Sequence, residues 1–236
     1  MTRIESRLNQ KTASLAQTNL NRRITFRRRL PWLGALLQFH FHKLHRFALA
    51  KPFSPKHSVC SVDRFNDSLC RPNDHTELPH RRKVVIPGNH DRAFSQDPRS
   101  RAMITNAVLL INEGATVCGL NIWGSPVTCD DDAFGYSKRE ERARLYASIH
   151  ADTHILVTHG PPYGILDREP GSHRREGCTE LRLAVMRLQP RLHVFGHVHA
   201  GYGVMPTKST LFVNSALLGW TGDIENRPIV LDITSW

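Results

Sequence analysis

The sequence predicts an α/β sandwich, in which β-strands and α-helices alternate along the chain and pack as layers. Three observations lead to this class. Short apolar runs recur from about residue 80 onward, each of a length suited to a buried strand. Two longer segments between these runs fit helices, and in the second of them apolar residues recur on one face. The late apolar runs are short and are followed by Gly or Asn, which favour turns.

The apolar runs define the expected strands. In chain order they are 83–86, 116–118, 121–123, 155–158, 192–195, 210–213 and 229–233. One helix is expected over 138–149, opened by Ser137, and a second over 179–188. The apolar residues on one face of this second helix are Leu181, Val185 and Leu188.

Positive charge is concentrated at the start of the chain. Of the net charge of +11, residues 1–50 contribute +9, because they hold ten Lys or Arg and a single acidic residue, Glu5. We therefore expect residues 1–56 to form a basic, disordered extension and residues 57–236 to form the main domain, with its motifs from residue 83. The extension resembles a mitochondrial transit peptide in composition, and it also suits contact with nucleic acid or anionic lipid. A tail without a fixed role is the third interpretation.

Cysteine content and hydropathy indicate the environment of the chain. The five cysteines are scattered and form no CxxC pair, which disfavours a zinc ribbon or a disulfide framework. No apolar run approaches the roughly 18 residues that a membrane-spanning helix requires. A cytoplasmic location is expected, with the mitochondrion as the alternative. The sequence does not define an oligomeric state.

Polar residues follow four of the expected strands. They are GNHD at 88–91, the HGPP that completes THGPP at 158–162, GHVH at 196–199 and Asn-Ser at 214–215. In layered α/β folds, ligands bind in the crevice at the carboxyl ends of strands. Gly88, Gly160 and Gly196 lie beside the histidines and leave room for a ligand to approach the backbone. We therefore expect these residues to form one site.

The residue types at these strand ends are those that bind metals. Imidazole nitrogens and an asparagine carbonyl oxygen suit zinc, iron or manganese, which polarise a phosphoryl oxygen and lower the pKa of bound water. In a strand, His197 and His199 would point to one side, whereas a loop would direct them toward two ions. Taken alone, His159 is better explained as a hydrogen-bonded histidine, since the chain has 14. GNHD and GHVH together favour a metal site.

The motifs GNHD, THGPP and GHVH, in this order, resemble those of the calcineurin-like metallophosphoesterase superfamily. The connecting segments are similar to its small single-domain branch, the metallophosphoesterase-domain-containing proteins; they are GSPVT at 124–128, GILD at 164–167 and LHVFGHVHAGYG at 192–203. The resemblance covers about residues 80–236. It implies a four-layer α/β/β/α sandwich with a dinuclear metal centre.

The resemblance also implies residue roles. The residues in the positions of metal ligands are Asn89, His159 and His197 for one ion and His199 for the other. His90 would lie beside the transferred phosphoryl group, where it would stabilise charge or protonate the leaving oxygen. Asp91 would orient His90.

The chain departs from the family pattern before GNHD. The family has a strand ending in Asp-x-His and then a Gly-Asp whose aspartate bridges the two metals, and neither is found here. The upstream candidates are Asp63, Asp67, Asp74 and His75. None follows an apolar strand in the sequence, although Asp63 and His75 stay possible as substitute ligands. The expected sandwich is therefore incomplete at its N-terminal part, and the site is expected to hold one ion, to bind metal weakly or to bind none.

The function implied is hydrolysis of a small phosphoester, such as a phosphodiester or nucleotide, with one or two divalent ions (Mn, Fe or Zn) as cofactors. The alternative is a non-catalytic protein of the same family that lacks the acidic metal ligands. A third hypothesis is nucleic-acid binding through the basic residues 1–50.

Other residues have competing interpretations. Asp130 to Asp132 fit a solvated loop better than a metal site, and Trp123 and Phe134 fit the core better than a substrate pocket. Four basic residues after THGPP fit phosphate binding and a solvated loop equally well; they are Arg168, His173, Arg174 and Arg175.

Overall fold

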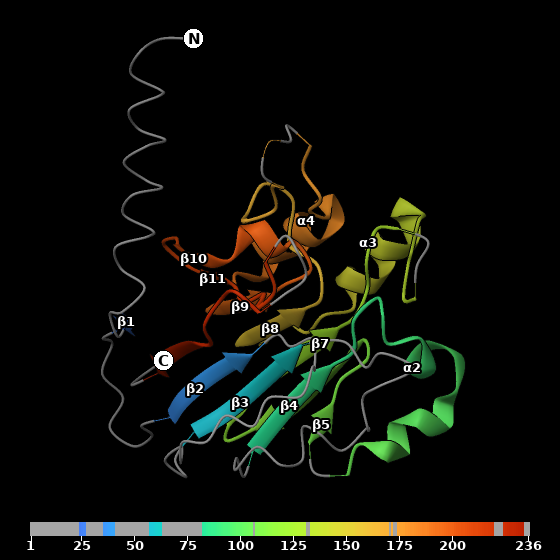
Figure 1. Cartoon of the computed structure of the whole chain (residues 1–236), viewed down its shortest axis with the longest axis horizontal. Helices are drawn as coiled ribbons and strands as arrows, with labels where there is room; N and C mark the ends of the chain where they lie inside the picture. Colours follow the sequence, from blue (N-terminus) through green and yellow to red (C-terminus); the bar gives the residue numbers. More distant parts are fainter. Residues whose placement is uncertain are drawn as a thin grey trace.

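The structure consists of two six-stranded sheets packed face to face, with helices on the outer side of the second sheet (Figure 1). It is a computed structural model. It describes residues 82–105, 107–130, 133–169, 171, 174–219 and 224–231, and the backbone of strands at 24–26, 35–40, 57–62 and 232–233. The predicted α/β sandwich is confirmed.

The first sheet has the strand order β1-β12-β2-β3-β4-β5. Its strands are β1 (Ile24–Phe26), β2 (Ala35–His40), β3 (His57–Val62), β4 (Arg82–Ile86), β5 (Val108–Leu109) and β12 (Ile229–Ile233). Strands β2 to β5 run parallel, and β12 is antiparallel to β2. The carboxyl ends of β3 and β4 coincide, because Val62 pairs with Ile86.

The second sheet has the order β10-β11-β9-β8-β7-β6. Its strands are β6 (Glu113–Val117), β7 (Leu120–Ser125), β8 (Ile155–Thr158), β9 (Leu192–Phe195), β10 (Gly203–Pro206) and β11 (Leu211–Asn214). The four central strands are parallel, and the two edge strands pair antiparallel to them. The polar residues at the ends of β8, β9 and β11 therefore lie at the same end of the sheet.

Five helical segments connect the strands of the described region. They are α2 (Arg92–Gln96), the 3-10 helix η2 (Pro98–Met103), α3 (Arg139–Ala147), α4 (Thr179–Leu188) and the 3-10 helix η3 (His199–Gly201). Both long helices, α3 and α4, lie over β7, β8 and β9, on the side away from β2, β3 and β4 (Figure 1). They cover the second sheet only.

Side-chain alternation along the second sheet builds two cores. On β8, Ile155 and Val157 face the first sheet, whereas Leu156 faces the helices. The two sheets approach closely at Gly124, where a Cβ atom would lie 2.5 Å from Leu110 Cβ and 2.8 Å from Ile86 Cγ2. Glycine is required there because any side chain would separate the sheets.

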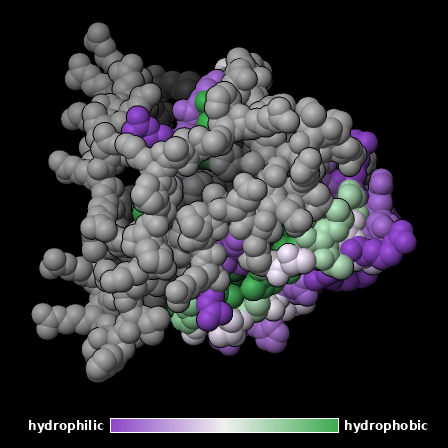
Figure 2. Space-filling model, turned by 60° about the horizontal axis from the view of Figure 1, so that its bottom comes forward, coloured by the Kyte–Doolittle hydropathy of each residue, from purple (hydrophilic) through white to green (hydrophobic). Residues whose placement is uncertain are grey.

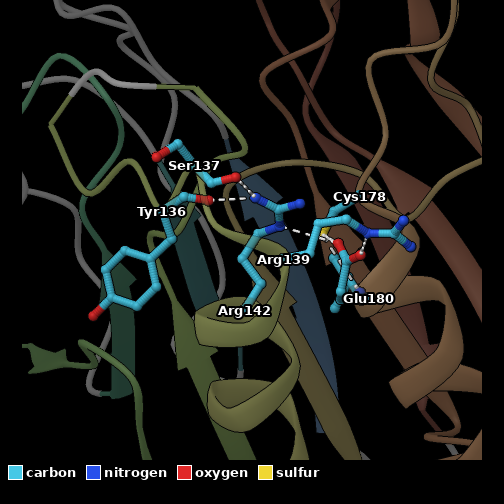
Figure 3. A network of polar contacts seen from close by, with 7 residues as sticks. Tyr136, Ser137, Arg139, Arg142, Cys178 and Glu180 are labelled. Atoms are coloured by element: carbon cyan, nitrogen blue, oxygen red, sulfur yellow. Dashed lines mark hydrogen bonds and ion pairs between the residues drawn. The ribbon is translucent and has the colours of Figure 1, made fainter.

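Helices α3 and α4 are joined by a buried ionic network (Figure 3). Glu180, in the first turn of α4, accepts hydrogen bonds from Arg142 Nε at 3.0 Å and from Arg139 Nε at 2.7 Å. Arg142 also donates to the carbonyl oxygens of Tyr136 and Ser137. The side chains of Arg142 and Glu180 are only 8% and 6% exposed, so the guanidinium and the carboxylate compensate each other away from bulk water.

Most of the expected elements are found with small shifts of their ends. The expected helix over 179–188 is confirmed with the same bounds, and the helix expected over 138–149 covers Arg139–Ala147. Ser137 does not open this helix; Lys138 is the N-cap residue, and the Ser137 carbonyl instead accepts a hydrogen bond from Arg142.

The strands before residue 82 were not predicted. In particular, β3 ends directly before Asp63, although its sequence HSVCSV has no continuous apolar run. Asp63 therefore does follow a strand, although not an apolar run, since pairing with β2 on one side and β4 on the other supports β3. Asp63 itself, with Asp67, Asp74 and His75, lies outside the described residues.

The segment expected as a basic extension, residues 1–56, contains β1 and β2. Strand β2 lies between β12 and β3 in the first sheet. The rest of this segment lies outside the described residues, so the division at residue 56 stays a prediction.

The described residues visible in Figure 2 are mixed in polarity, with hydrophilic and hydrophobic residues side by side on this face. Within the described part of the chain, no helix is long and apolar enough to cross a membrane.

Candidate metal centre

The GNHD motif forms a tight turn at the carboxyl end of β4. Asp91, only 1% exposed, accepts a hydrogen bond from Gly88 N at 2.5 Å, and its own N–H donates to Gly88 O at 3.0 Å. These two bonds close the turn around Asn89, which is buried, and His90, which is half-buried. Asp91 therefore fixes the backbone that presents both side chains.

His159 enters the same region from the end of β8. Its side chain is 2% exposed. Its backbone N–H donates to Ser125 O at 2.9 Å, and its carbonyl oxygen accepts from Gly196 N at 3.0 Å. The residue is thus held between the ends of β7 and β9.

The GHVH motif leaves β9 through a left-handed residue. His197 has φ +65°, a conformation that costs a non-glycine residue about 1 kcal/mol or more. Val198 N then donates to Gly196 O at 2.7 Å, and η3 begins at His199. This sharp turn directs His197 toward His159, with ring centroids 4.8 Å apart.

Three side chains converge at this edge of the sandwich. Asn89 Oδ1 lies 2.9 Å from His159 Nε2, which lies 3.1 Å from His197 Nδ1. Donor atoms that bind one ion at about 2.1 Å, at angles of 90 to 109°, are about 3.0 to 3.4 Å apart. The spacing and the chemistry of this amide oxygen and two imidazole nitrogens therefore fit a divalent cation.

His199 does not join these three side chains. Its Nδ1 lies 3.0 Å from Gly219 O, and because a carbonyl only accepts, Nδ1 carries the proton. Its Nε2 then presents a lone pair, which is the tautomer that histidine ligands use when a carbonyl holds the other nitrogen. The structure thus separates His199 from the cluster, as a loop conformation of His-x-His predicts.

The cluster contains no carboxylate. Among the described residues, no three His, Cys, Asp or Glu side chains gather closely enough to hold a metal ion. The cluster has only two histidines, His159 and His197, and its third donor atom is the amide oxygen of Asn89.

Comparison with known proteins assigns the family. The sequence profile of the calcineurin-like phosphoesterases matches residues 58–201, more than half of the chain. The chain belongs to the calcineurin-like phosphoesterase family. The matched range begins at the second residue of β3 and contains β4 and the motifs GNHD, THGPP and GHVH.

Individual relatives agree with this assignment. The chain is 35% identical over 199 residues to human metallophosphoesterase domain-containing protein 1, covering 73% of this chain and 59% of that protein. It is 32% identical over 186 residues to the UPF0046 protein K07C11.7 of Caenorhabditis elegans, covering 72% and 61%. It thus spans about three fifths of the length of these relatives. A solved crystal structure superposes with a TM-score of 0.61 over 86% of this chain and 96% of the other, at 18% identity, which shows a shared fold.

A cavity of about 170 Å³ adjoins the cluster of Asn89, His159 and His197, and His197 forms part of its lining. Its lining includes Gly160 and His197 from the cluster's loops, and also Cys129, Arg174 and Cys178. A hydrogen bond with the Cys178 thiol lowers the pKa of Cys129, and burial opposes that effect. The cavity lining therefore brings the Arg174 guanidinium and the Cys129 thiol close to the candidate ligands.

Asn214, at the end of β11, has a structural task that the sequence did not reveal. Its Nδ2 donates to Val198 O at 2.9 Å and to Leu166 O at 3.2 Å, and its Oδ1 accepts from Ala216 N at 3.1 Å. These bonds join the GHVH loop to the loops that contain Leu166 and Ala216. Asn following the strand was the only available signal.

The residues with competing interpretations are now placed. Trp123 is 3% exposed and packs in the core under the helices, as expected. Asp130 accepts a hydrogen bond from Thr128 Oγ1 at 2.5 Å and lines the cavity, while Asp131 and Asp132 lie outside the described residues. Phe134 is half-buried, with φ +62°.

Two of the arginines after THGPP pair with acids, and His173 of the same segment lies outside the described residues. Arg175 donates to Asp167 at 2.8 Å, and Arg174 lies 3.1 Å from Glu176 while also lining the cavity. Arg174 is therefore the better placed of these two residues to meet an anion.

Gly88→Ala is expected to disturb the cluster directly. An added Cβ would lie 2.8 Å from His159 Cε1 and 3.0 Å from its Nδ1, so the ring must shift. We expect Mn²⁺ affinity to fall at least tenfold and the unfolding free energy in urea to fall by about 1 to 3 kcal/mol.

Gly160→Ala is the matched control for this prediction, because an added Cβ there meets no atom within 4 Å. Its stability should stay within about 0.5 kcal/mol of the wild type. Equal effects of the two substitutions would show that the contact with His159 is not the cause.

Proposed function

We propose that this protein is a metal-dependent hydrolase of small phosphoesters, with phosphodiesters or nucleotides as the substrate class. One observation carries the proposal: Asn89 Oδ1, His159 Nε2 and His197 Nδ1 converge at separations of 2.9 and 3.1 Å. Membership of a phosphoesterase family supports the same reaction class.

The proposed ligands of one cation (Mn, Fe or Zn) are Asn89, His159 and His197, and His199 is proposed as a ligand of a second. Such ions, when bound, polarise a phosphoryl oxygen and lower the pKa of water. His159 and His197 must be neutral at the nitrogens that bind the ion, so acidic pH should oppose binding.

His90 is proposed as the catalytic residue of this chain. It lies in the turn directly after Asn89 and is half-buried, so it is accessible to a bound substrate. There it would stabilise charge on the phosphoryl group or give a proton to the leaving oxygen. Asp91 would act as a positioning residue, because its carboxylate holds Gly88 N and thereby the turn that presents His90.

Activity against an aryl phosphodiester in the presence of Mn²⁺ tests the proposal. We expect His90→Ala to lower kcat by about 10² to 10⁴-fold and to leave Mn²⁺ affinity unchanged, because His90 is not one of the converging donors. His150→Ala, at an exposed histidine after α3, is the control and should keep full activity. Hydrolysis by the wild type no faster than by His90→Ala would refute the catalytic role.

The absence of Asp-x-His and Gly-Asp from the sequence favours a second candidate, a non-catalytic member of the family. Carboxylates add negative charge that retains divalent ions, and the described cluster has none. Metal analysis of the purified full chain separates the candidates: two ions per chain support the enzyme, and zero or one supports the non-catalytic protein.

A further inference from the structure

A buried histidine lies next to the proposed metal site without belonging to it. His193, in the middle of β9, is 0% exposed and packs against Phe195 and Phe212, with ring centroids 5.0 and 5.8 Å away. Burial lowers its pKa to about 3, so the imidazole is neutral at physiological pH. Its Nε2 lies 2.8 Å from Thr158 Oγ1.

The partners define the direction of this hydrogen bond. Thr158 Oγ1 lies 2.7 Å from Gly160 O, and a carbonyl oxygen only accepts, so the threonine hydroxyl donates its one hydrogen there. Thr158 Oγ1 must then accept from His193, which places the proton of His193 on Nε2. The result is a directed chain from His193 Nε2–H to Thr158 Oγ1–H to Gly160 O.

This chain spans His159, because Thr158 precedes it and Gly160 follows it. The bond from Thr158 to Gly160 bends the backbone around His159 just where β8 ends. The His159 ring has little freedom to adapt, since even a Cβ atom added at Gly88 would lie 2.8 Å from its Cε1, and Asn89 Oδ1 lies 2.9 Å from its Nε2. A small change in this bend therefore moves Nε2 relative to the other donors.

We propose that His193 is a positioning residue of the metal site. Through Thr158 it holds the His159–Gly160 backbone in the bend that brings His159 Nε2 within 2.9 and 3.1 Å of Asn89 Oδ1 and His197 Nδ1. The inference rests on the proposed metal site and extends it by one layer of residues. A neutral histidine suits this task, because its rigid ring holds a single donor, Nε2–H, at a fixed distance from the backbone of β9.

A purely structural role for His193 makes different predictions, and two matched variants separate the roles. His193→Gln keeps an N–H donor near the position of Nε2, but it adds a buried amide oxygen. His193→Met has similar length and no donor, and it adds no buried polar group. We expect Gln to retain metal affinity and lose stability, and Met to lose metal affinity and keep more stability.

The first measurement uses the full chain and Co²⁺ alone, followed by its visible absorption. His193→Met and Thr158→Val should each weaken Co²⁺ binding by about 10 to 100-fold, and the double variant should be no weaker than either. His193→Gln should stay within about threefold of the wild type. Thr153→Val, which removes an equivalent bond from Thr153 Oγ1 to His150 O at 2.8 Å, should leave Co²⁺ binding unchanged. Wild-type affinity in His193→Met, or equal loss in Gln and Met, would overturn the proposal.

The second measurement is independent of metal. In the metal-free protein, NMR resonances of the His159 ring should shift in His193→Met and Thr158→Val but not in His193→Gln. If the wild type binds no Co²⁺ but the two variants show these shifts, the proposed metal site is refuted and the positioning role is retained. Unmoved His159 resonances in His193→Met would refute the positioning role.

Discussion

His197→Ala is expected to remove divalent-cation binding and hydrolysis together. His197 supplies one of three converging donors, and its Nδ1 lies 3.1 Å from His159 Nε2, so truncation leaves an amide oxygen and one imidazole. Loss of a ligand should exceed the 10 to 100-fold that is typical for supporting residues, so we expect at least about a hundredfold weaker Mn²⁺ binding. Isothermal titration with Mn²⁺ and the phosphodiester assay measure both effects.

The combination of readouts distinguishes His197 from His90. His90→Ala should lose turnover and keep the cation, whereas His197→Ala should lose both. Unchanged Mn²⁺ affinity in His197→Ala would show that the cluster is a hydrogen-bonded group of core histidines and not a metal centre.

Arg142→Met is expected to destabilise the fold by about 3 to 5 kcal/mol, because it leaves the buried Glu180 carboxylate without its less exposed partner. The carbonyl oxygens of Tyr136 and Ser137 lose their donor in the same substitution. Urea unfolding measures the change. Arg139→Met is the control: its side chain is 70% exposed, so its ion pair with Glu180 should contribute less than about 1 kcal/mol.

The stabilisation by Glu180 should also depend on pH. Burial tends to raise its pKa, but hydrogen bonds from Arg139 and Arg142 outweigh burial and lower the pKa to about 2, from 4.5. The folded state therefore binds this proton less readily than the unfolded state does. The stabilisation is complete above pH 4.5 and is lost as the pH falls toward 2. The stability difference between wild type and Glu180→Gln should shrink across that interval, and a constant difference would contradict this account.

The sequence predicted the second sheet well and most of the first sheet poorly. Strands such as Ile155–Thr158 and Leu192–Phe195 are buried on both faces, so they appear as mainly apolar runs without a polar face. Strand β3 mixes Val with His, Ser and Cys in no regular alternation, and β1 is three residues long; neither leaves a clear pattern. These strands depend on partners from distant parts of the chain, which local periodicity does not contain.

The candidate site shows the same division. The resemblance of the motifs to the family identified Asn89, His159 and His197 as candidate ligands of one ion, and the structure brings these three side chains together. The tasks of Asn214 and His193 were not predicted, because hydrogen bonds to a neighbouring loop leave no spacing rule in the sequence. The separation of His199 from the cluster depends on the backbone of a single residue, His197, and its positive φ cannot be inferred from GHVH.

At His197 the backbone conformation that favours stability and the side chain proposed for metal binding require different residues. Glycine would adopt the backbone of His197 without steric cost, so a chain optimised for folding alone would gain from glycine there. Laboratory selection for thermal stability alone should accordingly enrich His197→Gly, and this variant would lose the imidazole. Thermostable versions of this protein should therefore be sought by changes elsewhere, with residue 197 held fixed.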